Sequence, residues 1–225
     1  VWKGVCLLMS SFNAGFETKR SGTGVLTIGK EIGYEALPLA EMDFDKTQKD
    51  CRILFVNPPV DFSIFYSDMD LSDTKSSSPP IGILHLASMA RAYGYGVKLV
   101  DAHAEAMTIP QLLKVVVEFQ PHVVCLTAMT IMIDASAALA KAIKEVFPNI
   151  VTMIGGVHLT AEPSKTLLQY PQFDFGVVGE GEIVLIDFLD AFLTHRPWES
   201  VQSLVWKDVE QIHTNPRRSF FKNLD

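Results

Sequence analysis

Short segments rich in glycine, proline and hydroxyl side chains are the places in this sequence where ligand chemistry could occur. Two of them are Gly155-Gly156-Val157-His158-Leu159-Thr160 and Gly179-Glu180-Gly181-Glu182. A third is Thr127-Ala128-Met129-Thr130, and a fourth stretch begins at Asn57-Pro58-Pro59 and ends at Pro79-Pro80-Ile81-Gly82. Paired glycines let a bulky ligand lie against bare backbone, and prolines remove amide donors. These segments favour a broad, weakly charged ligand over a phosphate, which needs free backbone N–H groups.

Familiar motifs for other ligands are absent from the sequence. It contains no GxGxxG after its first apolar run, no GxxxxGK followed by Ser or Thr, and no GxSxG. A standard dinucleotide site, a P-loop and a hydrolase nucleophile elbow are therefore not expected. The three cysteines, Cys6, Cys51 and Cys125, are far apart and form no CxxC pair. A disulfide scaffold or a cysteine zinc site is not expected, and a reducing cytoplasm is the expected location.

The charge of the chain also excludes some functions. Lys plus Arg number 19 and Asp plus Glu number 26, which gives a formal net charge of −7. Because the basic residues form no cluster, we expect no nucleic-acid partner. No apolar stretch approaches the length needed to cross a bilayer, so no membrane span is expected.

The four segments follow apolar runs that alternate with helical patterns. We expect strands at Arg52–Asn57, Val97–Val100, His122–Thr127, Ile150–Ile154 and Phe173–Val178. We expect helices at Ile81–Tyr93, Ile109–Phe119, Ile133–Phe147 and Ala161–Tyr170, and a fifth that ends at Leu193. Five alternations predict an α/β fold, a doubly wound parallel sheet of five strands in the flavodoxin-like (Rossmann-like) order 2-1-3-4-5. Ligands of such sheets bind at the carboxyl ends of the strands, where all four segments lie.

Composition divides the chain into three parts. Residues 1–50 form an N-terminal extension, in which residues 1–41 are either upstream translation before a natural start at Met42 or part of a genuine extension or small domain. Residues 51–195 form the α/β domain. Residues 196–225 form a hairpin or edge strand within Ser203–Phe221, with a turn near Lys207-Asp208, and a linker.

Several strings in order resemble the cobalamin-binding N-terminal domain of class B radical S-adenosylmethionine enzymes. They are ILFVNPP, PPIGILHLASMARAYGYGVKLVDAH, GGVHLTAEP and GVVGEGE. The resemblance covers Arg52 to about Leu193, and the tail at Asn215-Pro216-Arg217 resembles the linker to a C-terminal radical domain. It implies that cobalamin (B12) lies across the carboxyl ends of the strands, with its nucleotide tail running down into the sheet.

The resemblance also implies which residues contact the cofactor. They are Asn57, Pro58, Pro59, Pro80, Gly82, Thr127, Met129, Thr130, Gly155, Gly156, His158, Thr160, Gly179, Glu180 and Gly181. In this family the cobalt usually receives no histidine from the protein. The segment Asp101-Ala102-His103 resembles part of a DxHxxG cobalt-ligating motif, but Ala106 replaces its glycine, so no metal ligation by His103 is expected. Substitution of valine for Gly155 or Gly156 is expected to block the binding of cobalamin and to leave the fold largely intact.

Structural roles compete with these site roles. Thr127 and Thr130 could cap the helix that follows them, and Met129 could belong to the core. His158 could bond within its own loop. Glu180 and Glu182 could serve the helix dipole instead of acid–base chemistry, and this is the role we expect.

The resemblance implies a cofactor module of a larger methyltransferase that acts on an unactivated carbon of a small molecule. The full-length enzyme would also hold a 4Fe–4S cluster and S-adenosylmethionine in its radical domain. The present sequence has no CxxxCxxC motif, so it is not expected to be catalytic alone. Two alternatives are a scaffold domain that has lost cobalamin and a flavodoxin-like binding or signalling module.

Overall fold

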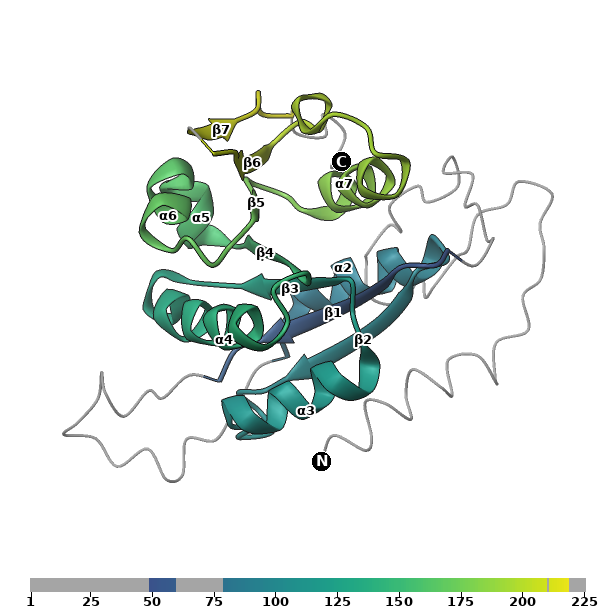
Figure 1. Cartoon of the computed structure of the whole chain (residues 1–225), viewed down its shortest axis with the longest axis vertical. Coiled ribbons are helices and arrows are strands. Elements are labelled where there is room, and N and C mark those ends of the chain that lie inside the picture. Colours follow the sequence, from purple (N-terminus) through teal and green to yellow (C-terminus); the bar gives the residue numbers. More distant parts are fainter. Residues whose placement is uncertain (1–48, 60–78, 210, 219–225) are drawn as a thin grey trace, which may run out of the picture. The chain divides into compact units, whose positions relative to one another are not determined.

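The strands of the chain pair into one mixed sheet in the computed structural model, which describes residues 49–59, 79–209 and 211–218 (Figure 1). The expectations for residues 1–48 and for the stretch 60–78 lie outside the described residues. The sheet order is β2-β1-β3-β4-β5-β6-β7. The strands are β1 (Arg52–Asn57), β2 (Gly96–Asp101), β3 (Val123–Thr127), β4 (Val151–Gly155), β5 (Phe175–Val177), β6 (Leu204–Lys207) and β7 (Ile212–Thr214).

The first five strands are parallel and confirm the predicted order 2-1-3-4-5. The sheet has seven strands instead of five, because the hairpin of the C-terminal part joins it. Strand β6 pairs antiparallel with β5, and β7 pairs antiparallel with β6. This hairpin covers the edge of β5, which would otherwise present unpaired backbone groups.

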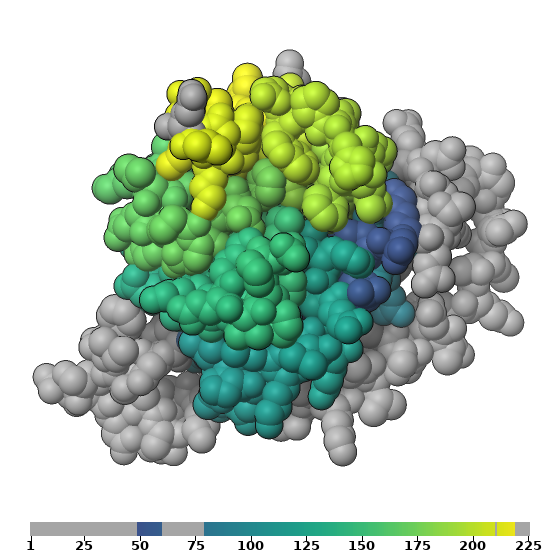
Figure 2. Space-filling view, in the orientation of Figure 1, coloured from purple at the N-terminus to yellow at the C-terminus, as the bar shows by residue number. Residues whose placement is uncertain are grey.

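Helices cover both faces of the sheet. They are α2 (Ile81–Ala92), α3 (Ile109–Phe119), α4 (Ile133–Val146), α5 (Val157–Ala161), α6 (Pro163–Gln169) and α7 (Glu182–Thr194). Helices α3 to α6 contribute to one apolar cluster, and α2 and α7 contribute to the other. Helix α6 also contacts both strands of the hairpin, and Figure 2 shows their side chains packed together.

The two clusters arise from the alternation of side chains along buried strands. In β1, Leu54 and Val56 face α3 and α4, whereas Ile53 and Phe55 face α2 and α7. All four side chains are buried, so the run is continuously apolar, as is typical of a parallel strand covered on both faces.

The segment after β4 differs from its prediction. A loop was expected up to Thr160 and a helix from Ala161. Instead the helix begins at Val157, directly after Gly156, and breaks at Glu162 with φ −134° before α6 starts at Pro163. The ring of a proline disfavours helical geometry in the residue before it, which explains the break at Glu162.

Among the described residues, none of the helices is long and apolar enough to cross a membrane.

Candidate functional site

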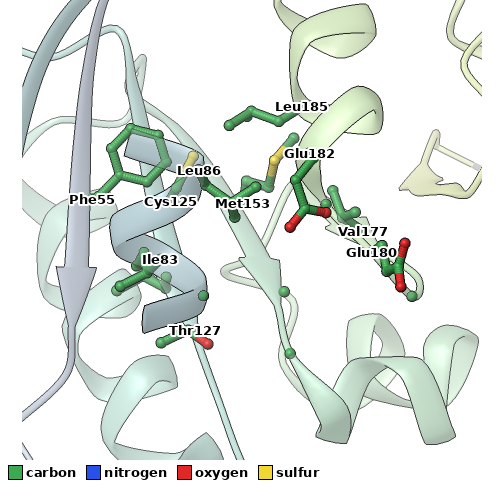
Figure 3. Close-up of a pocket in the computed structure, with 16 residues that line it drawn as sticks. Phe55, Ile83, Leu86, Cys125, Thr127, Met153, Val177, Glu180, Glu182 and Leu185 are labelled. Atoms are coloured by element: carbon green, nitrogen blue, oxygen red, sulfur yellow. The ribbon is translucent and has the colours of Figure 1, made fainter. Parts of the chain in front are cut away.

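A cavity opens at the carboxyl edge of the parallel strands, between the sheet and helices α2 and α7 (Figure 3). Its floor is formed by side chains of the strands. Phe55, Cys125 and Met153 lie in one row across β1, β3 and β4, since Phe55 pairs with Cys125 and Cys125 pairs with Met153. Val177 of β5 continues the same face. The floor is therefore apolar and polarizable.

The helices supply the opposite wall. Ile83 and Leu86 of α2 and Leu185 of α7 line the cavity with aliphatic carbon. At the start of α7, Oε1 of Glu182 lies 3.2 Å from Nδ1 of His85 on α2. This pair joins the two helices and gives Glu182 the partner that was not evident from the sequence.

Glycines form the rim. A Cβ atom built on Gly82, Gly155 or Gly179 would meet no other heavy atom within 4 Å, and all three residues line the cavity. Within the described residues, the space in front of these backbones is therefore open to a ligand.

Gly156 has a different role. Its φ is +105°, and an added Cβ would lie 2.6 Å from the carbonyl oxygen of Ala128. Glycine is required there by the backbone itself. The expectation that valine at Gly156 leaves the fold intact is therefore wrong, whereas the structure leaves room for valine at Gly155.

The cavity has a volume of about 220 Å³. An apolar cavity of about 150 Å³ takes one benzene ring, and whole small-molecule sites occupy roughly 300–1,000 Å³. The cavity is therefore larger than one that takes a single benzene ring and smaller than a whole small-molecule site, so it would take only a part of a larger ligand.

Burial raises the pKa of the Cys125 thiol well above its ordinary value, with a smaller contribution from Cys51. The thiol is therefore neutral at physiological pH and contributes an apolar surface rather than a metal-binding thiolate. Among the described residues, no group of three or more His, Cys, Asp or Glu side chains could hold a metal ion.

The structure brings seven of the predicted site residues together around the cavity. They are Gly82, Thr127, Gly155, Gly156, Gly179, Glu180 and Gly181. The other eight, which do not line it, are Asn57, Pro58, Pro59, Pro80, Met129, Thr130, His158 and Thr160.

Asn57 and Pro58 are buried at the end of β1. Asn57 Nδ2 donates to Asp101 Oδ1 at 2.8 Å, which joins the ends of β1 and β2. The other carboxylate oxygen, Asp101 Oδ2, is buried and accepts no hydrogen bond from the described residues. Pro59 and Pro80 are partly buried, and Pro80 stands directly before α2.

Thr130 begins a 3-10 turn after β3, and His158 lies in the first turn of α5. His158 Nδ1 is 3.3 Å from Thr130 Oγ1, so the side chain of His158 bonds to the segment after β3. Neither Thr127 nor Thr130 caps α4, whose N-cap is Met132 without a side-chain bond, so the capping role is wrong. Met129 is 49% exposed and is not a core residue.

Sequence reasoning missed the interior of the cavity. Its apolar lining consists of Phe55, Ile83, Leu86, Cys125, Leu126, Met153, Val177 and Leu185. In the sequence, an apolar residue that lines a cavity looks the same as one that packs in the core. The only signal for these lining residues is that they lie close in the sequence to the ends of strands and helices at the glycine segments.

The family of B12-binding domains matches residues 70–189 of this chain. The chain belongs to that family. The curated proteins similar to this B12-binding domain include an uncharacterized methyltransferase of Pyrococcus horikoshii. That protein is 30% identical over 174 residues, which cover 77% of this chain and 36% of the relative.

The anaerobic magnesium-protoporphyrin IX monomethyl ester cyclase of Cereibacter sphaeroides is 28% identical over 178 residues, which cover 77% of this chain and 28% of the cyclase. This domain thus spans about a third or less of the length of these curated relatives.

Solved structures share the fold. The cobalamin-dependent S-adenosylmethionine radical enzyme OxsB, with aqua-cobalamin and S-adenosylmethionine bound, matches 76% of this chain with a TM-score of 0.62 and 19% identity. The match covers 22% of the OxsB chain. The radical S-adenosylmethionine methyltransferase TsrM from Kitasatospora setae, with cobalamin and a 4Fe–4S cluster bound, gives a TM-score of 0.62 at 16% identity over 76% of this chain and 29% of TsrM.

Proposed function

We propose that this chain is the cobalamin-carrying domain of a radical S-adenosylmethionine methyltransferase that acts on an unactivated carbon. The observation that carries the proposal is the apolar cavity with a glycine rim at the carboxyl edge of the sheet. Family membership supports the cofactor, and the names of several relatives support the reaction class.

The residues of the edge fit the two parts of the cofactor. The cavity, with its floor of Phe55, Cys125 and Met153, would take the flat base of the nucleotide tail. Outside it, Ile81, Met129 and Val157 follow β1, β3 and β4 and are 75%, 49% and 65% exposed. We assign the corrin ring to this edge, where these three apolar side chains are exposed.

When bound, cobalamin would supply a carrier for a methyl group. The contribution of the protein is binding and shielding. The aliphatic wall of α2 and α7 excludes water from the tail, and the bare backbone at Gly155 and Gly179 permits close approach. The predicted site residues outside the cavity remain proposed contacts of the corrin edge.

The parts of the reaction that this sequence lacks belong to the rest of the proposed enzyme. Its 4Fe–4S cluster, S-adenosylmethionine and small-molecule substrate are assigned to a radical domain that follows the linker. Within the present sequence, residues 51–195 are assigned to cobalamin and residues 196–225 to the hairpin and linker.

Reconstitution tests the proposal. The purified chain is incubated with hydroxocobalamin, desalted, and examined by visible spectroscopy. We expect about one corrinoid per chain to remain bound. Cobinamide, which lacks the nucleotide tail, is the matched probe and should bind more weakly, because it leaves the cavity empty. If neither corrinoid is retained, the proposal is wrong and a scaffold role without cobalamin is favoured.

A further inference from the structure

The C-terminal hairpin returns the chain to the ligand edge. Strand β6 runs antiparallel to β5, and its first residue, Leu204, pairs with Val177 at the carboxyl end of β5. Strand β7 reverses direction again, and Thr214 pairs with Val205. The residues after Thr214 therefore leave the sheet at the same edge as the glycine loops after β4 and β5.

Thr160 connects those two glycine loops. Its hydroxyl donates to the carbonyl oxygen of Gly156 at 3.0 Å and accepts the backbone N–H of Gly179 at 2.9 Å. Gly156 and Gly179 both have positive φ, +105° and +78°. One side chain thus holds two backbone segments whose conformations only glycine adopts readily. The resemblance implies that Thr160 contacts the cofactor, and its hydroxyl also donates one and accepts one hydrogen bond within the protein, which leaves one lone pair of the oxygen for a ligand.

The outgoing chain attaches to the same residue. The guanidinium of Arg217 donates to the carbonyl oxygen of Thr160 at 3.1 Å. The next amide, that of Arg218, donates to Ser203 Oγ at 2.9 Å. The carbonyl oxygen of Ser203 accepts the N–H of Val178, the residue before Gly179, at 2.9 Å. The bonds thus form a closed ring that runs from the glycine loops to the outgoing chain and back.

Hydrogen bonds hold Ser203 and the outgoing chain in place. Ser203 is buried and has φ +61°, which is unfavourable for a residue with a side chain, so its surroundings must maintain this conformation. Its amide donates to the carbonyl oxygen of Pro216. Asn215 is buried beside it and donates through Nδ2 to the carbonyl oxygens of Trp198 and Val201. This density of bonds is characteristic of a fixed exit, not of a flexible linker.

We infer that Thr160 is a positioning residue that, through Arg217, couples the ligand edge to segment 215–218. Ligand binding at the glycine rim and the orientation of the outgoing chain are therefore linked, and each stabilises the other. The ligand in this inference rests on the proposed function, whereas the hydrogen-bonded ring does not.

Substitutions at Thr160 test the ligand half of the inference. Thr160→Val keeps the shape of the side chain and removes both hydroxyl bonds, and we expect the affinity for hydroxocobalamin to fall about tenfold. Thr160→Ser restores the hydroxyl and should bind within about twofold of the natural chain. Thr166→Val is the matched control, because Thr166 Oγ1 also donates to a carbonyl four residues earlier, that of Glu162, but at a site away from the rim.

The comparison separates positioning from general stability. A merely structural role predicts that Thr160→Val and Thr166→Val lower the melting temperature and affinity in proportion. Positioning predicts a loss of affinity in Thr160→Val alone. If Thr160→Val binds hydroxocobalamin as the natural chain does, the inference is wrong.

Amide hydrogen exchange tests the coupling between Thr160 and the outgoing chain, and it needs no ligand. The N–H of Gly179 donates to Thr160 Oγ1, so its hydrogen exchange, followed by NMR, should be faster in Thr160→Val and unchanged in Thr166→Val. Arg217→Ala should also speed this exchange two- to threefold, because it removes the bond that holds Thr160 from outside. An unchanged rate in Arg217→Ala contradicts the coupling. If the natural chain binds no corrinoid but the exchange rates of Gly179 change as expected, the proposed function is wrong, whereas the hydrogen-bonded coupling of Thr160 to Arg217 is supported.

Discussion

Valine at position 155 is expected to separate ligand binding from folding. Gly155 is the last residue of β4, and a Cβ there meets no other atom within 4 Å. Valine also suits a strand, so the free energy of unfolding should change by no more than about 0.5 kcal/mol. Its methyl groups would project into the cavity of about 220 Å³ and displace a flat ring.

The size of the binding effect follows from the buried ring. Burying an aromatic group contributes about 2–3 kcal/mol, which corresponds to roughly 30- to 150-fold in affinity. We therefore expect Gly155→Val to weaken hydroxocobalamin binding about 100-fold. Gly155→Ala, with its smaller side chain, is the graded control and should weaken binding less.

The neighbouring glycine supplies the opposite case. At Gly156 a side chain must accept φ +105° and an approach of 2.6 Å to Ala128 O. Such strain costs about 1–3 kcal/mol from the backbone alone, and the overlap adds to it. We take the total cost as about 3 kcal/mol. At about 2–4 °C for each kcal/mol in a domain of this size, Gly156→Val should lower the melting temperature by roughly 6–12 °C.

Both variants are measured by circular dichroism melting and by spectral titration with hydroxocobalamin. The reasoning fails if Gly155→Val binds as tightly as the natural chain, since the cavity would then not receive the ligand. It also fails if Gly156→Val melts at the natural temperature, because the positive φ would then impose no cost.

Two further predictions concern buried residues. Burial, with a smaller contribution from Asp50, raises the pKa of Cys51 from 9.0 to about 11; folding stability should therefore be lost as the pH rises from about 9 to 11, and urea unfolding of Cys51→Ala at pH 8 and 10.5 should show a smaller loss than the natural chain. Asp101→Ala removes the acceptor of the Asn57 side chain and should cost about 2–3 kcal/mol in urea unfolding, whereas Asp101→Asn should cost less than about 1 kcal/mol; equal costs would show that the bond is not stabilising.

The sheet could be predicted because its signals are local. Each parallel strand is a short apolar run followed by a glycine, a proline or a helical pattern, and right-handed crossovers leave few possible orders. Helix α5 escaped prediction because five residues between Gly156 and Glu162 are too few to show helical periodicity. The pairing of β6 with β5 was not specified either, because a three- or four-residue strand carries no information about its neighbour.

The site could be predicted only at its rim. Glycine segments such as Gly155-Gly156 show themselves by residue type, whereas Cys125 and Met153 resemble any other core residue. Contacts between distant segments were also out of reach. His85 and Glu182 are 97 positions apart, and neither of their local patterns indicates the other. The ring through Thr160 and Arg217 is of the same kind, since it depends on where the hairpin returns.

The cavity lies in the layer of α2 and α7, between these helices and the sheet. A ligand held there would add contacts to that layer, whereas the layer of α3 to α6 lies on the opposite face. Loading should therefore slow amide exchange in α2 and α7 more than in α3 and α4.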